Sequence, residues 1–372
     1  MAGAYRAACA AAGSRVLVTV EEGYTAGFTS LLLNGHRTME LLDARLSDLD
    51  VAPLAVALSE MHPFTVLDLS YNQLGAGAAE SLSQLIKSDR TVQTLDLSEN
   101  LLTSHAVEAL CTALKTNSTI REVRLSGNKL GGAGGMAIAE MLQTNTSIER
   151  LHLSNCELTT EALVALATVL RDNRQLLVLD VSRPLAATIM DEPASHFART
   201  LKLNTSLQEL NLSKSGLRDF GLRLLAEELY RAGAASQLRE LRLRCNRLEL
   251  VDEDCVTSFA MLLTSDACRI STLTLGGNRL GDEGALKLAE MLSENRSLLE
   301  LDVSSNSLRS RGLCALARAT SKHLILSQLE LSDNSFDTAA CLAWLPLIES
   351  SRKLTLDFAV QKVDGAYHCV RC

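Results

Sequence analysis

The chain has 372 residues and a formal net charge of −8, and only 3% of its residues are aromatic although 47% are hydrophobic. The acidic balance argues against a general nucleic-acid binder, because contacts with phosphates demand a basic surface. No apolar run approaches the roughly 18 residues that a membrane-spanning helix needs, and Arg6 and Arg15 interrupt the alanine-rich start, unlike in a secretory signal. We therefore expect a soluble, cytoplasmic protein that binds neither nucleic acid nor a membrane.

From Leu67 onwards one short motif, Leu-x-Leu-x-x-Asn-x-Leu, returns at a fixed interval. It begins at residues 67, 95, 123, 151 and 179, always 28 residues apart, and the same interval separates the starts at 273, 301 and 329. A fixed period of this length indicates a stack of similar units, none of which can bury its own apolar face alone. The period predicts a single elongated repeat domain.

The motif itself has the alternation of a β-strand. In the first repeat, Leu67 and Leu69 are expected to point into the core while Asp68 points outward. Asn72 follows where the chain leaves the strand. We expect its amide to satisfy main-chain groups of a neighbouring turn, so that successive repeats form a ladder of buried asparagines. Cys156 takes this position in one of the later repeats.

The second half of each repeat is predicted to be a helix with one buried face, because apolar or small residues follow the spacing i, i+4, i+7, i+8. The first repeat has them at Ala78, Leu82, Leu85 and Ile86. The asparagines that follow the expected helices include Asn117, Asn145, Asn173 and Asn295. We expect these asparagines to adopt the left-handed conformation that ends many helices. The pattern predicts an α/β fold, namely a curved, right-handed βα leucine-rich-repeat solenoid, or horseshoe, with a parallel inner sheet and outer helices.

The regular spacing also predicts the limits of the solenoid. Counting 28 residues back from Leu67 reaches a degenerate repeat that begins at Met39 and ends at Leu46, so residues 1–38 are expected to form an N-terminal cap. Residues 39–358 form the expected solenoid, with a last strand from Leu354 to Phe358. Residues 359–372 are expected to turn and close the end of the stack as a C-terminal tail, because an open end exposes core and a strand edge.

The spacing becomes irregular in the repeats of residues 179–272. Successive starts at 179, 210, 241 and 273 lie 31, 31 and 32 residues apart, and Pro184 and Ser215 replace two of the asparagines. The segment from Arg183 to Pro193 cannot follow the regular path, because its prolines fix φ and lack an N–H donor. Insertions in repeat proteins fall on one loop edge, which is often the binding edge, although drift of a surface loop explains them equally well.

The outward strand positions predict the charges of the inner face, with a basic centre between acidic ends. Such a pattern selects and orients a partner more than it adds affinity, although solvated charges that only keep the protein soluble are the alternative. The candidate partner-binding residues are Arg183, Lys214, Arg242, Arg244, Asp191 and Glu192. The acidic ends include Asp302 and Glu330.

Patterns typical of catalysis and of cofactor binding are poor. The glycine-rich segment 131–135 is not followed by the Gly-Lys-Ser/Thr of a phosphate loop, and its glycines suit close packing between repeats. Cys369 and Cys372 resemble half of a zinc site, but no second pair has matching spacing. We expect no catalytic residue, cofactor, metal or small-molecule substrate, and we expect the ten cysteines to be mostly buried thiols.

The 28-residue pattern of residues 39–358 resembles the ribonuclease-inhibitor type of leucine-rich repeat. Within that class, departures from the bare repeat resemble the family of leucine-rich repeat-containing protein 34. The segments that carry this second resemblance are 183–184, 191–196, 203–207, 218–221, 244–247, 311–315 and 363–368. The resemblance implies a link to cilia and flagella, and hence protein partners within an axonemal complex.

Two functions remain open from the sequence. The first is a non-enzymatic protein–protein interaction scaffold that is a structural component of the ciliary or flagellar axoneme. The second is a GTPase-activating protein resembling the Ran-activating leucine-rich-repeat family. Those relatives carry a strongly acidic C-terminal stretch, whereas this tail has Lys362 and Arg371 and no acidic run. The scaffold is therefore favoured.

Overall fold

The computed structural model describes residues 2–26, 28–35, 45–59, 62–185, 190–350, 353–363 and 365–371. The chain forms two compact units, Met1–Ala187 and Thr188–Cys372. The first unit contains the parallel strands β1 (Ser30–Leu32), β2 (Val66–Asp68), β3 (Thr94–Asp96), β4 (Glu122–Arg124), β5 (Arg150–His152) and β6 (Val178–Asp180). Its helices are α1 (Ala2–Ala12), α2 (Val18–Ala26), α3 (Asp48–Leu58), α4 (Ala76–Ser88), α5 (Ser104–Leu114), α6 (Gly131–Thr144) and α7 (Thr160–Leu170).

The second unit repeats the same alternation of strand and helix. Its parallel strands are β7 (Glu209–Asn211), β8 (Glu240–Arg242), β9 (Thr272–Thr274), β10 (Glu300–Asp302), β11 (Gln328–Glu330) and β12 (Thr355–Leu356). Its helical segments are α8 (Asp191–Leu201), α9 (Asp219–Ala232), the 3-10 turn η2 (Gly233–Ala235), α10 (Glu253–Leu263), α11 (Gly281–Glu294), α12 (Ser310–Lys322) and α13 (Thr338–Ile348). An antiparallel hairpin of β13 (Phe358–Val363) and β14 (Ala366–Arg371) follows.

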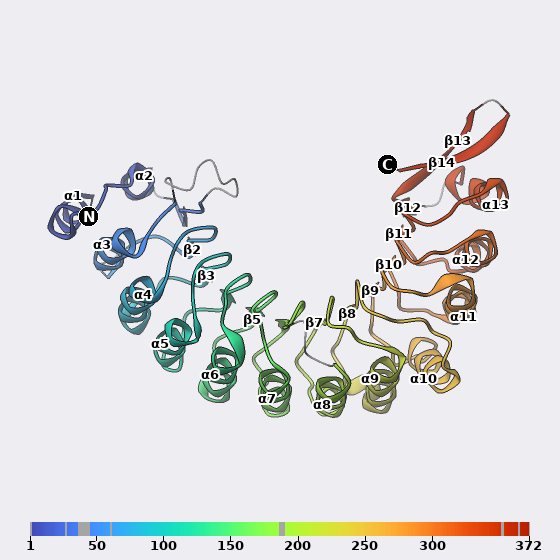
Figure 1. The fold of residues 1–372 in the computed structure, drawn as a ribbon, viewed down its shortest axis with the longest axis horizontal. Helices are drawn as coiled ribbons and strands as arrows, with labels where there is room; N and C mark the ends of the chain where they lie inside the picture. The colour runs from blue at the N-terminus through green and yellow to red at the C-terminus, as the bar shows by residue number, and fades with distance from the viewer. Residues whose placement is uncertain are drawn as a thin grey trace. The chain divides into compact units, whose positions relative to one another are not determined.

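Within each unit the strands lie side by side on the inner side of a curve, and the helices cover the outer side (Figure 1). Neighbouring strands pair in register, so that Leu67 aligns with Leu95 and Leu273 with Leu301. These leucines are at most 2% exposed, because each strand turns one face towards the helices of its own and the next repeat. The predicted α/β leucine-rich-repeat solenoid is confirmed.

The asparagine ladder is present and buried. Asn100 donates from Nδ2 to the carbonyl oxygen of Leu69 in the preceding repeat at 2.9 Å, and its Oδ1 accepts from the N–H of Leu74 at 3.1 Å. Asn128 makes the equivalent bonds to Leu97 and Leu102. Each amide therefore satisfies a donor and an acceptor that the turn of its neighbour leaves open. The same pattern recurs in the second unit at Asn246, Asn278, Asn306 and Asn334.

The asparagines at the helix ends form a second ladder, but our prediction of a left-handed backbone there was wrong. Asn145 has φ −70° and Asn295 has φ −64°, both extended. The side chain of Asn145 does the capping. Its Oδ1 accepts from the N–H groups of Ser147 and Ile148 at 2.9 and 2.8 Å, and its Nδ2 donates to the carbonyl of Leu114 at 2.7 Å. A short amide that bonds to following main-chain N–H groups needs no left-handed residue.

In each repeat, the residue with a left-handed backbone instead lies one position before the asparagine position of the first ladder. Glu99 has φ +53° and Gly127, its equivalent in the next repeat, has φ +76°. The same conformation occurs at Arg183 and Lys214, with φ +51° and +55°. The turn after each strand therefore imposes this backbone whatever the side chain, which explains why residues other than glycine adopt it here.

A buried histidine–aspartate pair takes the place of an asparagine in the second ladder of the first unit. Asp89 accepts from His62 Nε2 at 2.9 Å and from the N–H groups of Thr91 and Val92 at 3.2 and 2.8 Å. The Nδ1 of His62 accepts from the N–H of Phe64, so the proton of a neutral ring lies on Nε2. Burial alone would raise the pKa of Asp89, but the hydrogen bonds outweigh it and hold that pKa below its usual value.

This lowered pKa predicts the pH dependence of an Asp89→Ala variant. A carboxyl with a folded-state pKa below its unfolded-state pKa stabilises the fold above the unfolded value, and the stabilisation disappears as pH falls through the folded value. We expect the variant to lose about 1–3 kcal/mol of unfolding free energy at neutral pH. The deficit should shrink below about pH 4, where an ordinary aspartate is protonated.

Denaturant unfolding of parent and variant across this pH range is the measurement. Asp89→Asn is the matched control, because Asn117 makes the same two main-chain bonds in the next repeat. It should remain close to the parent at neutral pH. A deficit of Asp89→Ala that stays constant down to pH 2 would contradict the role given to the carboxylate.

The ends of the repeat region differ from the regular pattern. The strand that pairs with β2 is β1, with Leu31 beside Leu67, so it lies earlier in the chain than a 28-residue spacing places it. Most of the degenerate repeat predicted from Met39 falls in residues 36–44, outside the described residues. At the other end, the strand predicted at Leu354–Phe358 is present as β12, and a hairpin follows it. The division into an N-terminal cap, a solenoid and a tail stays a prediction.

The sequence suggested that the extra residues of the irregular repeats fall on one loop edge. In the structure they lie on both edges. In the second unit, η2 adds residues after a helix, and Gly233 with φ +52° turns the chain there. The loop from β8 to α10 is also longer than the loop from β9 to α11, so these extra residues lie after a strand. Loops after strands and loops after helices lie on opposite edges of a βα stack, so the insertions alone do not mark one binding edge.

Candidate partner-binding site

Three of the six predicted residues lie on the outward strand face of the second unit. Arg242, on β8, forms an ion pair with Glu240 of the same strand. Arg244, two positions later, forms an ion pair with Asp302 on β10 and lies 4.0 Å from Glu330 on β11. Lys214 occupies the left-handed position after β7 and is exposed.

Arg244 and Asp302 form the centre of this face. The Asp302 side chain is only 7% exposed, and its Oδ1 accepts from the N–H and Oγ of Ser304 at 2.9 and 2.6 Å. Gly276 follows β9, the strand between them, by two residues, and a Cβ atom there would clash with the Asp302 carboxylate. The absence of a side chain at Gly276 therefore leaves room for the pair, which joins β8 to β10 across β9.

This pair changes the charge pattern expected from the sequence. Asp302 and Glu330 were expected to form an acidic end separate from the basic centre, but Arg244 contacts both. In contrast, Lys214 has no ion-pair partner within 4.0 Å among the residues that the structure describes. The strand face thus combines a neutralised pair with an available cation, a mixture typical of surfaces that select a partner by charge.

The other three predicted residues lie elsewhere. Asp191 and Glu192 form the first turn of α8, where acidic side chains stabilise the positive end of the helix dipole. Arg183 belongs to the first unit, and residues 186–189 of the loop that follows it are outside the described residues. The assignment of all six residues to one site stays a prediction.

The strand face of the first unit has its own ion pairs, between Arg124 and carboxylates of β3 and β4. Arg124 lies 2.7 Å from Glu122 of the same strand and 3.6 Å from Asp96 of the neighbouring strand. Asp68, Asp96 and Asp180 each use one carboxylate oxygen to accept the N–H of the residue two positions later. These carboxylates therefore fix the turn after the strand in addition to facing outward.

Sequence reasoning missed a second charged surface, on the loops that follow the strands of the second unit. A depression of about 380 Å³ is lined by Arg218, Asp219, Phe220, Arg247, Glu249, Asp252 and Arg279. Arg247 and Arg279 occupy the same position of two successive repeats, just before the leucine that ends the motif. This shared position is the signal in the sequence that could have found the surface.

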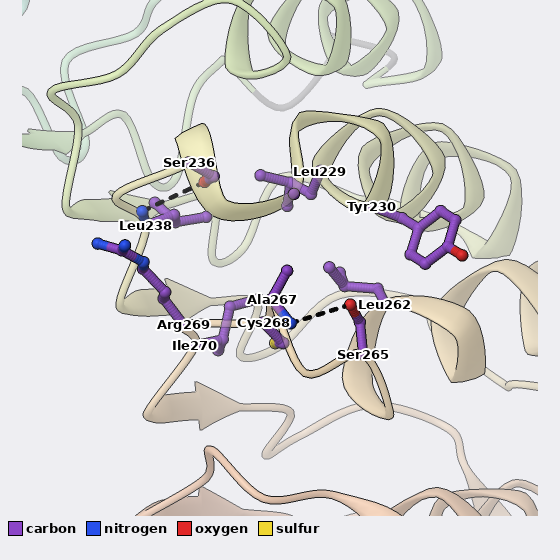
Figure 2. A pocket seen from close by; sticks show the side chains of 11 residues that line it. Leu229, Tyr230, Ser236, Leu238, Leu262, Ser265, Ala267, Cys268, Arg269 and Ile270 are labelled. Carbon is purple, nitrogen blue, oxygen red and sulfur yellow. Dashed lines mark hydrogen bonds between the residues drawn. The ribbon is translucent and has the colours of Figure 1, made fainter.

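A much smaller cavity lies on the opposite loop edge, where η2 adds residues. Figure 2 shows Tyr230 and Cys268 among its lining side chains, with Ser236 and Ser265 accepting the N–H groups of Leu238 and Ala267. Its volume of about 10 Å³ has room for a single water. This cavity is therefore a packing gap of the irregular repeat and is too small for a ligand.

The described part of the chain offers no cluster of three or more histidine, cysteine, aspartate or glutamate side chains arranged for a metal ion. Cys372, one half of the Cys-x-x-Cys pair, lies outside that part. The nine described cysteines are thiols without disulfides, and burial raises the pKa of Cys111 and Cys156 to about 12. Among the described helices, none is long and apolar enough to cross a membrane.

Comparison with known proteins supports the repeat fold. A family model described as "Leucine Rich repeat" matches residues 60–83, 116–139, 144–167, 203–226, 270–289 and 294–317. The mouse (Mus musculus) ribonuclease inhibitor is 33% identical over 111 residues, which cover 30% of this chain and 23% of the inhibitor. The mouse NACHT, LRR and PYD domains-containing protein 5 is 31% identical over 115 residues, 30% of this chain and 9% of that protein.

The matched region thus spans less than a quarter of either relative. Among solved structures, the tropomodulin C-terminal domain from the structural genomics of Caenorhabditis elegans is 15% identical, covers 41% of this chain and 92% of that chain, and has a TM-score of 0.37. Each range matched by the family model contains one strand of the structure and the first part of the helix that follows it. The βα units of this chain are therefore leucine-rich repeats, and in sequence they are similar to those of the ribonuclease inhibitor.

Proposed function

We propose that this chain is a non-enzymatic scaffold for protein–protein interaction, and that its partner docks on the outward strand face of the second unit around Lys214, Arg242 and Arg244. The observation that carries the proposal is the Arg244–Asp302 pair, held by Ser304 and by the space at Gly276. A charged group fixed on a rigid sheet loses little side-chain entropy when a partner binds. Such a surface suits recognition without chemistry.

The finer part of the proposal is that the scaffold is a component of the ciliary or flagellar axoneme. Its support is the resemblance of segments such as 183–184, 218–221 and 244–247 to the family of leucine-rich repeat-containing protein 34. Two of these segments contain or adjoin the charged surfaces of the second unit. A partner within an axonemal complex would be a protein that presents complementary charges to the strand face.

Charge reversal tests the strand face. We expect the Arg242→Glu/Arg244→Glu double variant to capture the native partner from ciliated cells at least tenfold less efficiently than the parent, because hydrogen bonds to charged groups contribute about 1.5–3 kcal/mol each. Binding by the parent should weaken as salt is raised. Quantitative recovery of the partner on immobilised protein is the measurement.

Two further variants keep this test decisive. Arg296→Glu/Arg318→Glu changes two exposed charges that lie off the strands of the same unit, and it should bind as the parent does. Lys214→Glu removes a cation without breaking an ion pair, so it should weaken capture without a change in melting temperature. Reversal of Asp302 is unsuitable as a control because Arg244 contacts it. Full capture by both Lys214→Glu and the double variant would refute the proposed face.

A further inference from the structure

The depression on the strand-to-helix loops of the second unit contains three arginines that form no ion pair with any residue that the structure describes. Its wall is the long loop from β8 to α10, which contains Glu249 and Asp252. The carboxylate of Asp219 holds this loop by accepting the N–H groups of Glu249, Val251 and Asp252 at 2.9, 3.1 and 3.4 Å. Leu250, with φ +55°, is fully buried beneath it. The wall is therefore fixed by three hydrogen bonds from its main-chain N–H groups to Asp219 and by the buried side chain of Leu250.

The arginines are also anchored through their main chain. Arg247 donates its backbone N–H to Leu217 at 2.9 Å, and Arg279 donates to Leu248 at 2.9 Å, so the two residues follow each other from repeat to repeat. Arg218 precedes the first residue of α9. All three side chains are exposed, and within the described residues none has a carboxylate within 4.0 Å. Three neighbouring guanidinium groups repel one another unless an anion lies between them.

The acidic residues of the depression do not neutralise the three guanidinium groups. Asp219 is committed to the loop, and Asp252 caps α10 by accepting the N–H of Cys255 at 2.8 Å. The carboxylate of Glu249, which also lines the depression, accepts no such main-chain bond from the described part of the chain. Although the lining has equal numbers of arginines and acidic residues, the guanidinium donors remain available while two of the three carboxylates are already used. The depression therefore offers more available guanidinium donors than available carboxylate acceptors.

We propose that this depression binds an acidic segment of a protein partner, whose Asp or Glu carboxylates pair with Arg218, Arg247 and Arg279. A guanidinium pairs with a carboxylate through two parallel hydrogen bonds, which gives the contact a fixed geometry. Phe220, 48% exposed and with the Arg223 guanidinium 5.3 Å from its ring centroid, adds an apolar wall for the stem of such a side chain. This surface is separate from the strand face proposed above, so either proposal can fail alone.

The test uses the purified full chain and a fluorescently labelled oligoglutamate peptide, with binding followed by anisotropy. We expect Arg218→Gln/Arg247→Gln/Arg279→Gln to weaken binding by about tenfold for each arginine, the change expected from the loss of one hydrogen bond to a charged group. The matched control is Arg296→Gln/Arg318→Gln/Lys322→Gln, which removes three exposed charges from the same unit and should bind like the parent. If both triple variants lose affinity for the peptide equally, the effect comes from net charge alone and the proposed site is wrong.

The Glu249→Gln variant tests whether the ligand carries negative charge. An acidic segment is repelled by Glu249, so this variant should bind oligoglutamate more tightly than the parent by several fold. Weaker binding of the same peptide would overturn the proposal. A phosphoserine peptide provides the last arm, because arginine clusters also bind phosphate. If that peptide binds and oligoglutamate does not, the carboxylate assignment is wrong.

Discussion

Replacement of Asn100 by leucine should lower the unfolding free energy by about 3 kcal/mol. Asn100 is 6% exposed, and its Nδ2 donates to the carbonyls of Leu69 and Leu97 at 2.9 and 3.0 Å, while its Oδ1 accepts from Leu74 at 3.1 Å. Leucine has the same branching at Cγ but no polar atom, so buried main-chain groups of two repeats lose their partners. Each buried group left without a hydrogen bond costs about 1–3 kcal/mol. Urea unfolding followed by circular dichroism gives the difference.

The same substitution at Ser215 is the control for this ladder. Ser215 takes the asparagine position but makes a single side-chain bond, from its Oγ to the carbonyl of Ser213 at 3.3 Å. Its replacement by leucine should therefore cost clearly less than replacement of Asn100. If Asn100→Leu unfolds at the same urea concentration as the parent, the ladder does not stabilise the repeat.

The repeat period predicted the fold because each repeat solves the same packing problem. Leucines at fixed positions must point inward, and the next strand then has one register that buries its own leucines. The same logic placed the asparagine ladder, whose side chains bond both to their own turn and to the preceding repeat. The N-terminal strand escaped this logic, because β1 pairs with β2 after a longer stretch of chain than the period allows. The repeat period therefore does not predict the position of a strand that precedes the first regular repeat.

The backbone conformations were harder to predict than the elements. An asparagine after a helix suggests either a left-handed backbone or a side chain that bonds to following N–H groups, and sequence alone does not separate them. In Asn145 the second applies. The left-handed turn lies instead after each strand, at residues as different as Glu99, Lys214 and Gly277, so composition gives no warning of it.

The candidate site could be predicted only as a set of outward charges. The pairing of Arg244 with Asp302 joins residues 58 positions apart, and it depends on a long side chain crossing an intermediate repeat at Gly276. Spacing predicts which face a side chain occupies but not which neighbour it reaches. Asp191 and Glu192 show the reverse error, because two acidic residues in a predicted loop belong to the first turn of a helix.

The second large expected effect is at Trp344, which joins the last helix to the C-terminal hairpin. Its ring is fully buried and meets Phe358 edge to face, with centroids 5.7 Å apart, and Phe358 in turn contacts Phe336 at 4.8 Å. Trp344→Ala should cost about 3–5 kcal/mol, the range for truncation of a buried large aromatic residue. The hairpin of β13 and β14 should also become more sensitive to limited proteolysis, because Phe358 begins it.

Trp344→Phe separates packing from hydrogen bonding at the same position. Among the described residues, the indole Nε1 of Trp344 is buried without a hydrogen-bond partner, so the tryptophan already carries the cost of an unsatisfied donor. Phenylalanine keeps much of the ring contact with Phe358 and removes that donor. Its cost should therefore be clearly smaller than that of Trp344→Ala, because the cavity left behind is smaller. Equal losses for Trp344→Phe and Trp344→Ala would contradict the stabilising role given to the aromatic contact with Phe358.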